Sequence, residues 1–128
     1  MSTYTVKNLK DVPDMAAERP EDIEARFARS QLGSEHLGVS YFRYGSGFRS
    51  AMGHSHIEQE EVYVVVAGSG RVKLDDEIRD LRQWDVVRVA PAVVRAFEAG
   101  PDGLELIVVG SDRPEEGDGQ MVPDWWTD

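Results

Sequence analysis

The apolar and polar residues of this chain alternate in short runs, a pattern typical of half-buried β-strands rather than of helices. Glycine-containing segments at residues 45–47, 68–70 and 100–103 separate several of these runs and are typical of tight turns. The pattern predicts strands at residues 26–32, 37–44, 61–66, 71–74, 77–81, 86–89, 94–98 and 104–109. Strands at this even spacing, with no helical periodicity between them, predict an all-β sandwich or small barrel.

The barrel is expected to span residues 21–110, where this pattern holds. The preceding residues 1–20 mix isolated apolar positions with prolines, so we expect an extended N-terminal arm. Residues 14–19 could form one helical turn, which Pro20 would end because a proline disfavours helical backbone in the residue before it.

The C-terminal segment, residues 111–128, is acidic and carries the adjacent pair Trp125 and Trp126. An acidic tail is normally solvated, but two large aromatic side chains are seldom left exposed together. We therefore expect the tryptophans to dock on the barrel or on a partner subunit. Binding of a separate ligand or protein is the alternative.

Composition narrows the class of protein. A chain of 128 residues and 14.3 kDa is expected to form one domain with a real core. It has no cysteine, so disulfides and thiolate metal sites are excluded, and any metal must be bound by nitrogen and oxygen atoms. No stretch reaches the roughly 20 apolar residues of a membrane span, and the first residues lack the pattern of a signal peptide. We expect a soluble, cytoplasmic protein.

Net charge argues against two classes of partner. The formal charge of −10 at pH 7 disfavours nucleic acid, whose phosphates need a basic surface. Anionic membranes are disfavoured for the same reason. The excess of acidic groups otherwise serves mainly solubility.

Candidate chemistry is concentrated in residues 53–68, which contain two of the three histidines of the chain. His54 and His56 are separated by one residue, and alternate side chains on a strand point to the same face. Both imidazoles can therefore converge on one point, provided that this face looks into a cavity.

These residues resemble the first motif of the cupin superfamily. That motif is a glycine, five residues, His-x-His, three or four residues, a glutamate, six residues and a glycine. Here four residues separate His56 from Glu61, and six residues separate Glu61 from Gly68. The leading glycine is displaced, because Gly47 lies one residue too far upstream. The resemblance covers the central region and implies a double-stranded β-helix, the jelly-roll barrel of cupins.

The second cupin motif is not matched. It is a glycine, five residues, Pro-x-Gly, two residues, a histidine, three residues and an asparagine. Its fixed positions fall here on Trp84, Ala90, Ala92, Arg95 and Ala99, and none of the five agrees. Arg95 therefore stands where the family places its third metal-binding histidine.

The resemblance implies a divalent metal site inside the barrel, with His54, His56 and Glu61 as ligands. Imidazole and carboxylate ligands suit Fe, Mn, Ni, Zn or Cu. Glu61 has the opposite strand parity to the histidines, so residues 57–60 must turn the chain before it can join them. Glu60 has the required parity and is the alternative ligand, but the spacing of the motif favours Glu61.

Arg95 leaves two outcomes open, because a guanidinium cannot ligate a metal and repels one nearby. In the first, Arg95 swings outward or pairs with Glu61, the cavity is free of metal, and the histidines bind a ligand by hydrogen bonds. In the second, Arg95 lies beside a three-ligand metal and grips a carboxylate or phosphate of the substrate. Arg95, Tyr63 and Phe97 are accordingly the candidates for substrate binding.

Two functions are compatible with the resemblance. One is a metal-dependent enzyme, of the oxygenase or isomerase type, that acts on a small polar or anionic molecule. The alternative is a non-catalytic module that binds or senses a small molecule in a metal-free pocket. Single-domain cupins commonly form dimers, so we also expect a homodimer, in which the arm could add a strand to the partner's sheet edge.

Overall fold

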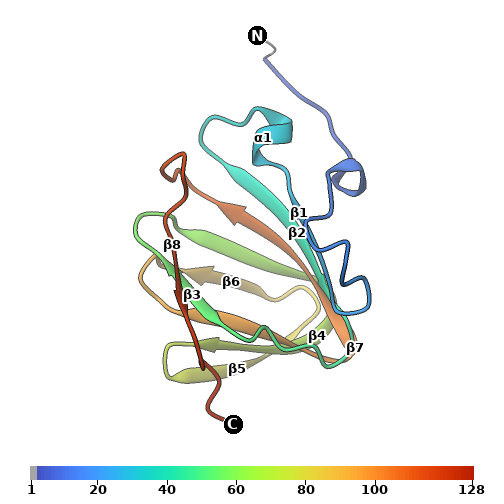
Figure 1. The fold of residues 1–128 in the computed structure, drawn as a ribbon, viewed down its shortest axis with the longest axis vertical. Helices are drawn as coiled ribbons and strands as arrows, with labels where there is room; N and C mark the ends of the chain where they lie inside the picture. The colour runs from blue at the N-terminus through green and yellow to red at the C-terminus, as the bar shows by residue number, and fades with distance from the viewer. Residues whose placement is uncertain (1–2) are drawn as a thin grey trace.

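The computed structural model describes residues 3–128 and confirms the predicted all-β class (Figure 1). Met1 and Ser2, at the start of the predicted arm, lie outside the described residues. Among residues 3–128 no helix is long and apolar enough to cross a membrane. In chain order the elements are η1 (Leu9–Asp11), β1 (Ile23–Phe27), α1 (Arg29–Leu32), β2 (Gly38–Tyr44), β3 (Gly53–His56), β4 (Glu61–Leu74), β5 (Glu77–Arg82), β6 (Val86–Val89), β7 (Arg95–Gly110) and β8 (Gly119–Val122).

The two longest strands, β4 and β7, belong to both halves of a curled antiparallel sheet. In one half, the first part of β4 lies between β6 and the last part of β7. The last part of β7 also pairs with β2, and β2 pairs with β1. In the other half, the last part of β4 lies between β5 and the first part of β7; the first part of β7 also pairs with β3, and β3 pairs with β8. Two strand layers connected by long shared strands make up the jelly-roll barrel.

Glycines mark the place where β4 and β7 pass from one layer to the other. The backbone of Gly68 has φ +76° and that of Gly103 has φ +80°, a region that residues with a Cβ rarely adopt. A Cβ on Gly68 would also collide with the carbonyl oxygen of Gly103, and one on Gly70 would collide with that of Glu98. The register of β4 against β7 shifts on either side of Gly68. These glycines therefore allow two backbones to bend and approach each other closely.

This geometry corrects three of the predicted boundaries. The turns predicted at residues 68–70 and 100–103 are wrong, because β4 and β7 continue through both segments as bent strands. The strand predicted at residues 26–32 is wrong beyond Phe27, where the chain forms α1 instead. That helix ends at Gly33, which has φ +64° and whose N–H group donates to the last helical turn.

The interior of the barrel is filled by aromatic and aliphatic side chains that alternate along the strands. Burial of each large aliphatic side chain contributes about 1.5–3 kcal/mol relative to leaving it in water. Four of the core residues, Tyr44, Tyr63, Phe97 and Val108, also line the cavity described below, so these side chains belong both to the core and to the cavity wall. The buried core consists of Tyr44, Tyr63, Val65, Val72, Leu81, Val89, Phe97, Ala99, Leu104, Leu106 and Val108.

Part of the predicted N-terminal arm lies along β1 of its own chain. Asp14 forms a β-bridge with Arg26, and its carboxylate accepts hydrogen bonds from the backbone N–H groups of Ala16 (2.9 Å) and Ala25 (3.0 Å). The residues before η1 lead away from the barrel in Figure 1. The homodimer, with the arm on the partner's sheet, stays a prediction.

A buried carboxylate ties the arm to the barrel. Glu24 of β1 is contacted by Lys10 from the arm at 2.7 Å, by Arg26 at 2.6 Å and by Arg43 of β2 at 3.2 Å. Burial of the carboxyl raises its pKa, but the hydrogen bonds from these three cations outweigh burial and lower the pKa to about 2. Glu24 is therefore ionised in the folded protein at neutral pH.

The acidic tail lies against the barrel, where β8 pairs with β3 along its whole length (Figure 1). The indole N–H of Trp126 donates to the carbonyl oxygen of Ser50 at 2.8 Å, and the guanidinium of Arg49 lies 4.4 Å from the Trp126 ring. The ammonium of Lys73 lies 4.0 Å from the ring of Trp125 and donates to its backbone carbonyl. Both tryptophans thus pack on the barrel surface.

Replacement of Gly68 by alanine should destabilise the protein more than the same change at Gly33. Both glycines have positive φ, which costs an alanine about 1–2 kcal/mol. A Cβ at Gly33 meets open space, whereas one at Gly68 meets the backbone of Gly103. Urea denaturation of Gly68→Ala and Gly33→Ala measures the difference. Equal losses in the two variants would contradict the close approach of β4 and β7.

The Glu24→Gln variant should lose stability in a pH-dependent way. At pH 7 we expect a loss of about 1.5–3 kcal/mol, the range for hydrogen bonds to charged groups. Because the folded-state pKa of Glu24 is lowered from 4.5 to about 2, its ionised form stabilises the protein above pH 4.5, and this contribution is lost as the pH falls toward 2. Urea denaturation at several pH values should show the difference between wild type and variant shrinking over that interval. A difference independent of pH would contradict this assignment.

Candidate functional site

Strand β3 presents both histidines of the first motif to one cavity. His54 lies opposite Arg95 of β7 and Met121 of β8, so β3 is held on both sides. The two imidazole rings are edge to face, with centroids 5.2 Å apart, and both line the cavity. The side chain of His54 is 33% exposed and that of His56 is 12% exposed, so His54 is the more accessible of the two.

Glu61, the first residue of β4, joins the histidines despite its opposite strand parity. Residues 57–60 leave the strand conformation and supply the expected turn. The Glu61 Oε1 atom lies 3.3 Å from Nε2 of His56 and 3.8 Å from Nε2 of His54. One ligand atom from each of the three residues lies within 4.8 Å of the other two. Glu60, the alternative ligand, forms an ion pair with Arg88 on the surface and does not line the cavity.

Asp118 contacts the ring nitrogen of His56 that does not face Glu61. Its Oδ1 lies 2.8 Å from Nδ1 of His56, and its Oδ2 accepts hydrogen bonds from the backbone N–H groups of Glu58 (2.7 Å) and Gln59 (2.9 Å). Burial raises the pKa of Asp118, but the two backbone N–H groups and His56 outweigh it and lower the pKa to about 2. An ionised Asp118 accepts the Nδ1 proton of His56 and thereby fixes the tautomer of the ring. Sequence reasoning missed this residue.

The other ring nitrogen of His56 is buried without a hydrogen-bond partner. Its Nε2 is close to Glu61 in distance but is not aligned with that carboxylate for a hydrogen bond. The carboxylate of Glu61 raises the pKa of His56, burial opposes it, and Asp118 adds to the increase. Buried polar atoms are almost always satisfied in folded proteins, so an unpaired ring nitrogen in a cavity requires an explanation.

Arg95 lies behind Glu61 rather than in the cavity. The side chain is completely buried, with 0% exposure, and it does not line the cavity. Its Nη2 lies 3.3 Å from Glu61 Oε1, its Nε donates to the hydroxyl of Tyr63 at 3.3 Å, and its Nη1 donates to the carbonyl oxygen of Val93 at 2.8 Å. This arrangement corresponds to the outcome in which Arg95 pairs with Glu61.

The remaining sequence candidates, Tyr63 and Phe97, form part of the cavity wall. Their rings lie 4.7 Å apart, and the Tyr63 hydroxyl donates to Glu61 Oε1 at 2.5 Å. Burial raises the pKa of Tyr63 well above its ordinary value, so the phenol keeps the proton that it donates. Burial also acts to raise the pKa of Glu61, but the two histidines and Tyr63 outweigh it and hold this pKa well below the usual range.

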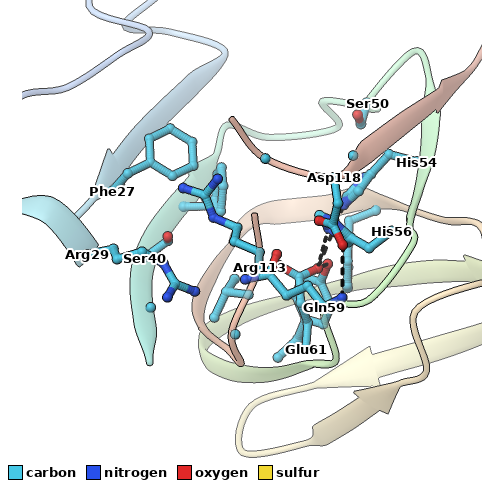
Figure 2. A pocket seen from close by; sticks show the side chains of 18 of the residues that line it. Phe27, Arg29, Ser40, Ser50, His54, His56, Gln59, Glu61, Arg113 and Asp118 are labelled. Carbon is cyan, nitrogen blue, oxygen red and sulfur yellow. Dashed lines mark hydrogen bonds and ion pairs between the residues drawn. The ribbon is translucent and has the colours of Figure 1, made fainter. Parts of the chain in front are cut away.

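The cavity has a volume of about 450 Å³, within the range of about 300–1,000 Å³ of small-molecule sites. Figure 2 shows His54, His56 and Asp118 together on one side, with Arg29, Arg113 and Phe27 across from them. The lining combines apolar and aromatic residues with these and other polar side chains. The cavity is therefore suited to a small organic ligand that carries polar groups.

The sequence matches no protein-family model and no curated protein. Solved structures, in contrast, match most of the chain. A cupin protein from Bacteroides fragilis shares 20% identity at a TM-score of 0.70, over 100% of this chain and 99% of that one. A sugar phosphate isomerase of the cupin superfamily from Silicibacter pomeroyi shares 15% identity at a TM-score of 0.70, over 93% and 92% of the two chains.

A variant of oxalate decarboxylase from Bacillus subtilis shares 23% identity at a TM-score of 0.76, over 92% of this chain. The chain spans 33% of the length of that enzyme. At these identities the likenesses show the fold, and they confirm the cupin barrel that the first motif implied.

Removal of the Arg95 guanidinium should destabilise the protein even when no ligand or metal is present. Arg95→Met removes the buried guanidinium that pairs with the partly buried carboxylate of Glu61, and breaking a buried ion pair costs up to about 3–5 kcal/mol. The matched control, Arg88→Met, breaks an exposed pair and should cost about 1 kcal/mol or less. Urea denaturation in the presence of EDTA gives the free energy of unfolding of each variant for this comparison.

The double variant Arg95→Met/Glu61→Gln should recover part of the loss, because it removes the uncompensated charge. If Arg95→Met were as stable as Arg88→Met, the guanidinium would not be needed to hold Glu61.

Proposed function

We propose that this chain, a protein of the cupin fold, binds one divalent metal ion through His54, His56 and Glu61 and catalyses a reaction of a small anionic molecule in the cavity. The observation that carries the proposal is the buried, unpaired Nε2 of His56. Its ring is held by Asp118 through the other nitrogen. Metal-binding histidines are usually arranged in this way, with a carboxylate on one ring nitrogen and the lone pair of the other directed at the ion.

The donor set suits Fe, Mn, Ni, Zn or Cu, because it combines two imidazole nitrogens with one carboxylate. Three protein ligands leave coordination positions for a substrate. Oε1 of Glu61 lies 3.3 Å from Nε2 of His56 and 3.8 Å from Nε2 of His54, so one ion could contact all three groups. Such an ion would compete with protons for the imidazole nitrogens, as metals do at other histidine sites.

When bound, the ion would supply Lewis acidity toward an oxygen atom of the substrate. The side chains of the protein have separate tasks. Asp118 orients His56, while Arg95 and Tyr63 hold the Glu61 carboxylate in place by hydrogen bonds. Phe97 forms the cavity wall beside Tyr63. We propose a reaction of the isomerase or oxygenase type, in which oxygen atoms of the substrate face the ion.

The structural neighbours support an anionic substrate. Two of them are enzymes named for small anions, a sugar phosphate in one case and oxalate in the other. A small anion also suits a cavity of about 450 Å³ whose lining includes Arg29 and Arg113.

The contact between Arg95 and Glu61 favours a second candidate, a non-catalytic module that binds a small molecule without metal. In this case Arg95 balances the charge of Glu61, and the histidines donate hydrogen bonds to the ligand. The two candidates differ in one measurable respect. Ligand binding by a metal-free module does not require the metal, whereas turnover by the enzyme does.

The metal centre is tested by the metal content of protein purified without a histidine tag. After incubation with Fe, Mn, Ni, Zn or Cu and removal of free metal, we expect about one ion per chain in the wild type and none in His54→Ala/His56→Ala. Asp118→Asn should still bind but about 10–100-fold more weakly, because it loses the charge that orients His56. Elemental analysis and calorimetric titration provide the measurements.

The third histidine supplies a matched control for these variants. His36 is exposed and pairs with Asp112 at the surface, so His36→Ala should bind metal as the wild type does. Equal metal content in the wild type and in His54→Ala/His56→Ala would overturn the proposed centre.

A further inference from the structure

We infer that Arg29 and Arg113 form a second binding site, which holds a carboxylate or phosphate group at the end of the ligand remote from His54 and His56. This inference extends the proposed function. It rests on that proposal for which groups of the protein contact the near end of the ligand. It assigns the ligand to a narrower class, organic molecules with an acidic group at the distal end.

Both arginines line the same cavity as the histidines but come from other parts of the chain. Arg29 is the first residue of α1, and Arg113 lies between β7 and β8. Figure 2 draws them across the cavity from His54 and His56. A ligand that contacts the histidines with one end can therefore present its other end to the two guanidinium groups.

Contacts with neighbouring residues hold the guanidinium of Arg29 in position. Its Nη2 donates to the carbonyl oxygen of Ser111 at 2.7 Å, which brings the guanidinium close to the segment that carries Arg113. The group also lies directly on Gly38, where an added Cβ would be 2.7–2.9 Å from three atoms of the guanidinium. A residue with a Cβ at position 38 would require the guanidinium to shift from this position. One bond to a carbonyl fixes the group and leaves other N–H groups for a ligand.

Arg113 is exposed at the mouth of the cavity and lies against Gly117. An added Cβ on Gly117, which has φ +84°, would be 3.1 Å from Nη1 of Arg113. Within residues 3–128, the arginines that form no ion pair with a carboxylate are Arg29, Arg82 and Arg113. Two of these three line the cavity, in a chain whose net charge is −10. Unneutralised positive charge is thus gathered where a ligand would enter.

The chemistry of the two groups defines what they bind. A guanidinium is always charged and presents a planar fork of N–H groups that matches a carboxylate or a phosphate. Phe27 lies on the same side of the cavity as the arginines and meets Phe42 edge to face, with centroids 5.5 Å apart. The site therefore fits a molecule with an acidic distal end and a polar near end.

Binding of linear dicarboxylates to the metal-free protein tests the inference. The probes are malonate to suberate, each compared with the monocarboxylate of the same carbon number, in calorimetric titrations with EDTA. We expect at least one dicarboxylate to bind about 10-fold or more tightly than its monocarboxylate, the gain of a charge-assisted hydrogen bond. Phosphonocarboxylates of similar length distinguish a phosphate-like distal group from a carboxylate, and a preference for either supports the site.

Arg29→Gln/Arg113→Gln should lose this preference, while the control Arg82→Gln, which removes an arginine outside the cavity, should keep it. Arg113→Gln alone should reduce the preference, and it breaks no side-chain hydrogen bond or ion pair within residues 3–128. Dicarboxylates that bind no better than monocarboxylates, or a preference that survives in the double variant, would overturn the inference.

The proposed metal centre and the proposed arginine site can be rejected independently of each other. The titrations use metal-free protein, so absence of metal binding would overturn the centre at His54, His56 and Glu61 without changing the result for the arginines. Conversely, Arg29→Gln/Arg113→Gln should bind metal as the wild type does, because neither residue contacts the three ligands.

Discussion

The arrangement of the cavity depends on the partly buried carboxylate of Glu61. A carboxylate removed from water is stable only where donors and positive charge surround it. Tyr63 and Arg95 contact it from the core, while His54 and His56 approach it from the cavity. Where the second cupin motif has a histidine, this chain has an arginine that pairs with Glu61, one of the three proposed ligands.

Most of the fold could be predicted because its signals are local. Period-two alternation requires only a few adjacent residues, and it located six of the strands to within a few positions. The glycines were harder to interpret, since the same residue permits a tight turn and a close contact between two bent strands. Gly68 and Gly103 belong to the second kind, which is decided by a neighbour far away in the chain. Residues 29–32 were likewise too few for a helical period to be visible.

The site was predictable only as far as its members are adjacent in sequence. His54, His56 and Glu61 occur within eight residues and form a recognisable spacing. Asp118 is one acid among several in the tail, and it reaches His56 only because β8 pairs with β3. Arg29 reaches the cavity through a bond to a backbone carbonyl, which no sequence pattern encodes. The role of Arg95 required knowing which side of Glu61 it occupies.

The strand pairing of the tail also determines when the site can exist during synthesis. His56 is oriented by a residue 62 positions later in the chain, so both histidines emerge from the ribosome before the carboxylate that fixes the tautomer of His56. Contacts between residues far apart in sequence are slow to form because the loop between them must first close. A nascent chain therefore carries the His-x-His pair before His56 is oriented, and the orientation seen here requires β8 to have joined the barrel.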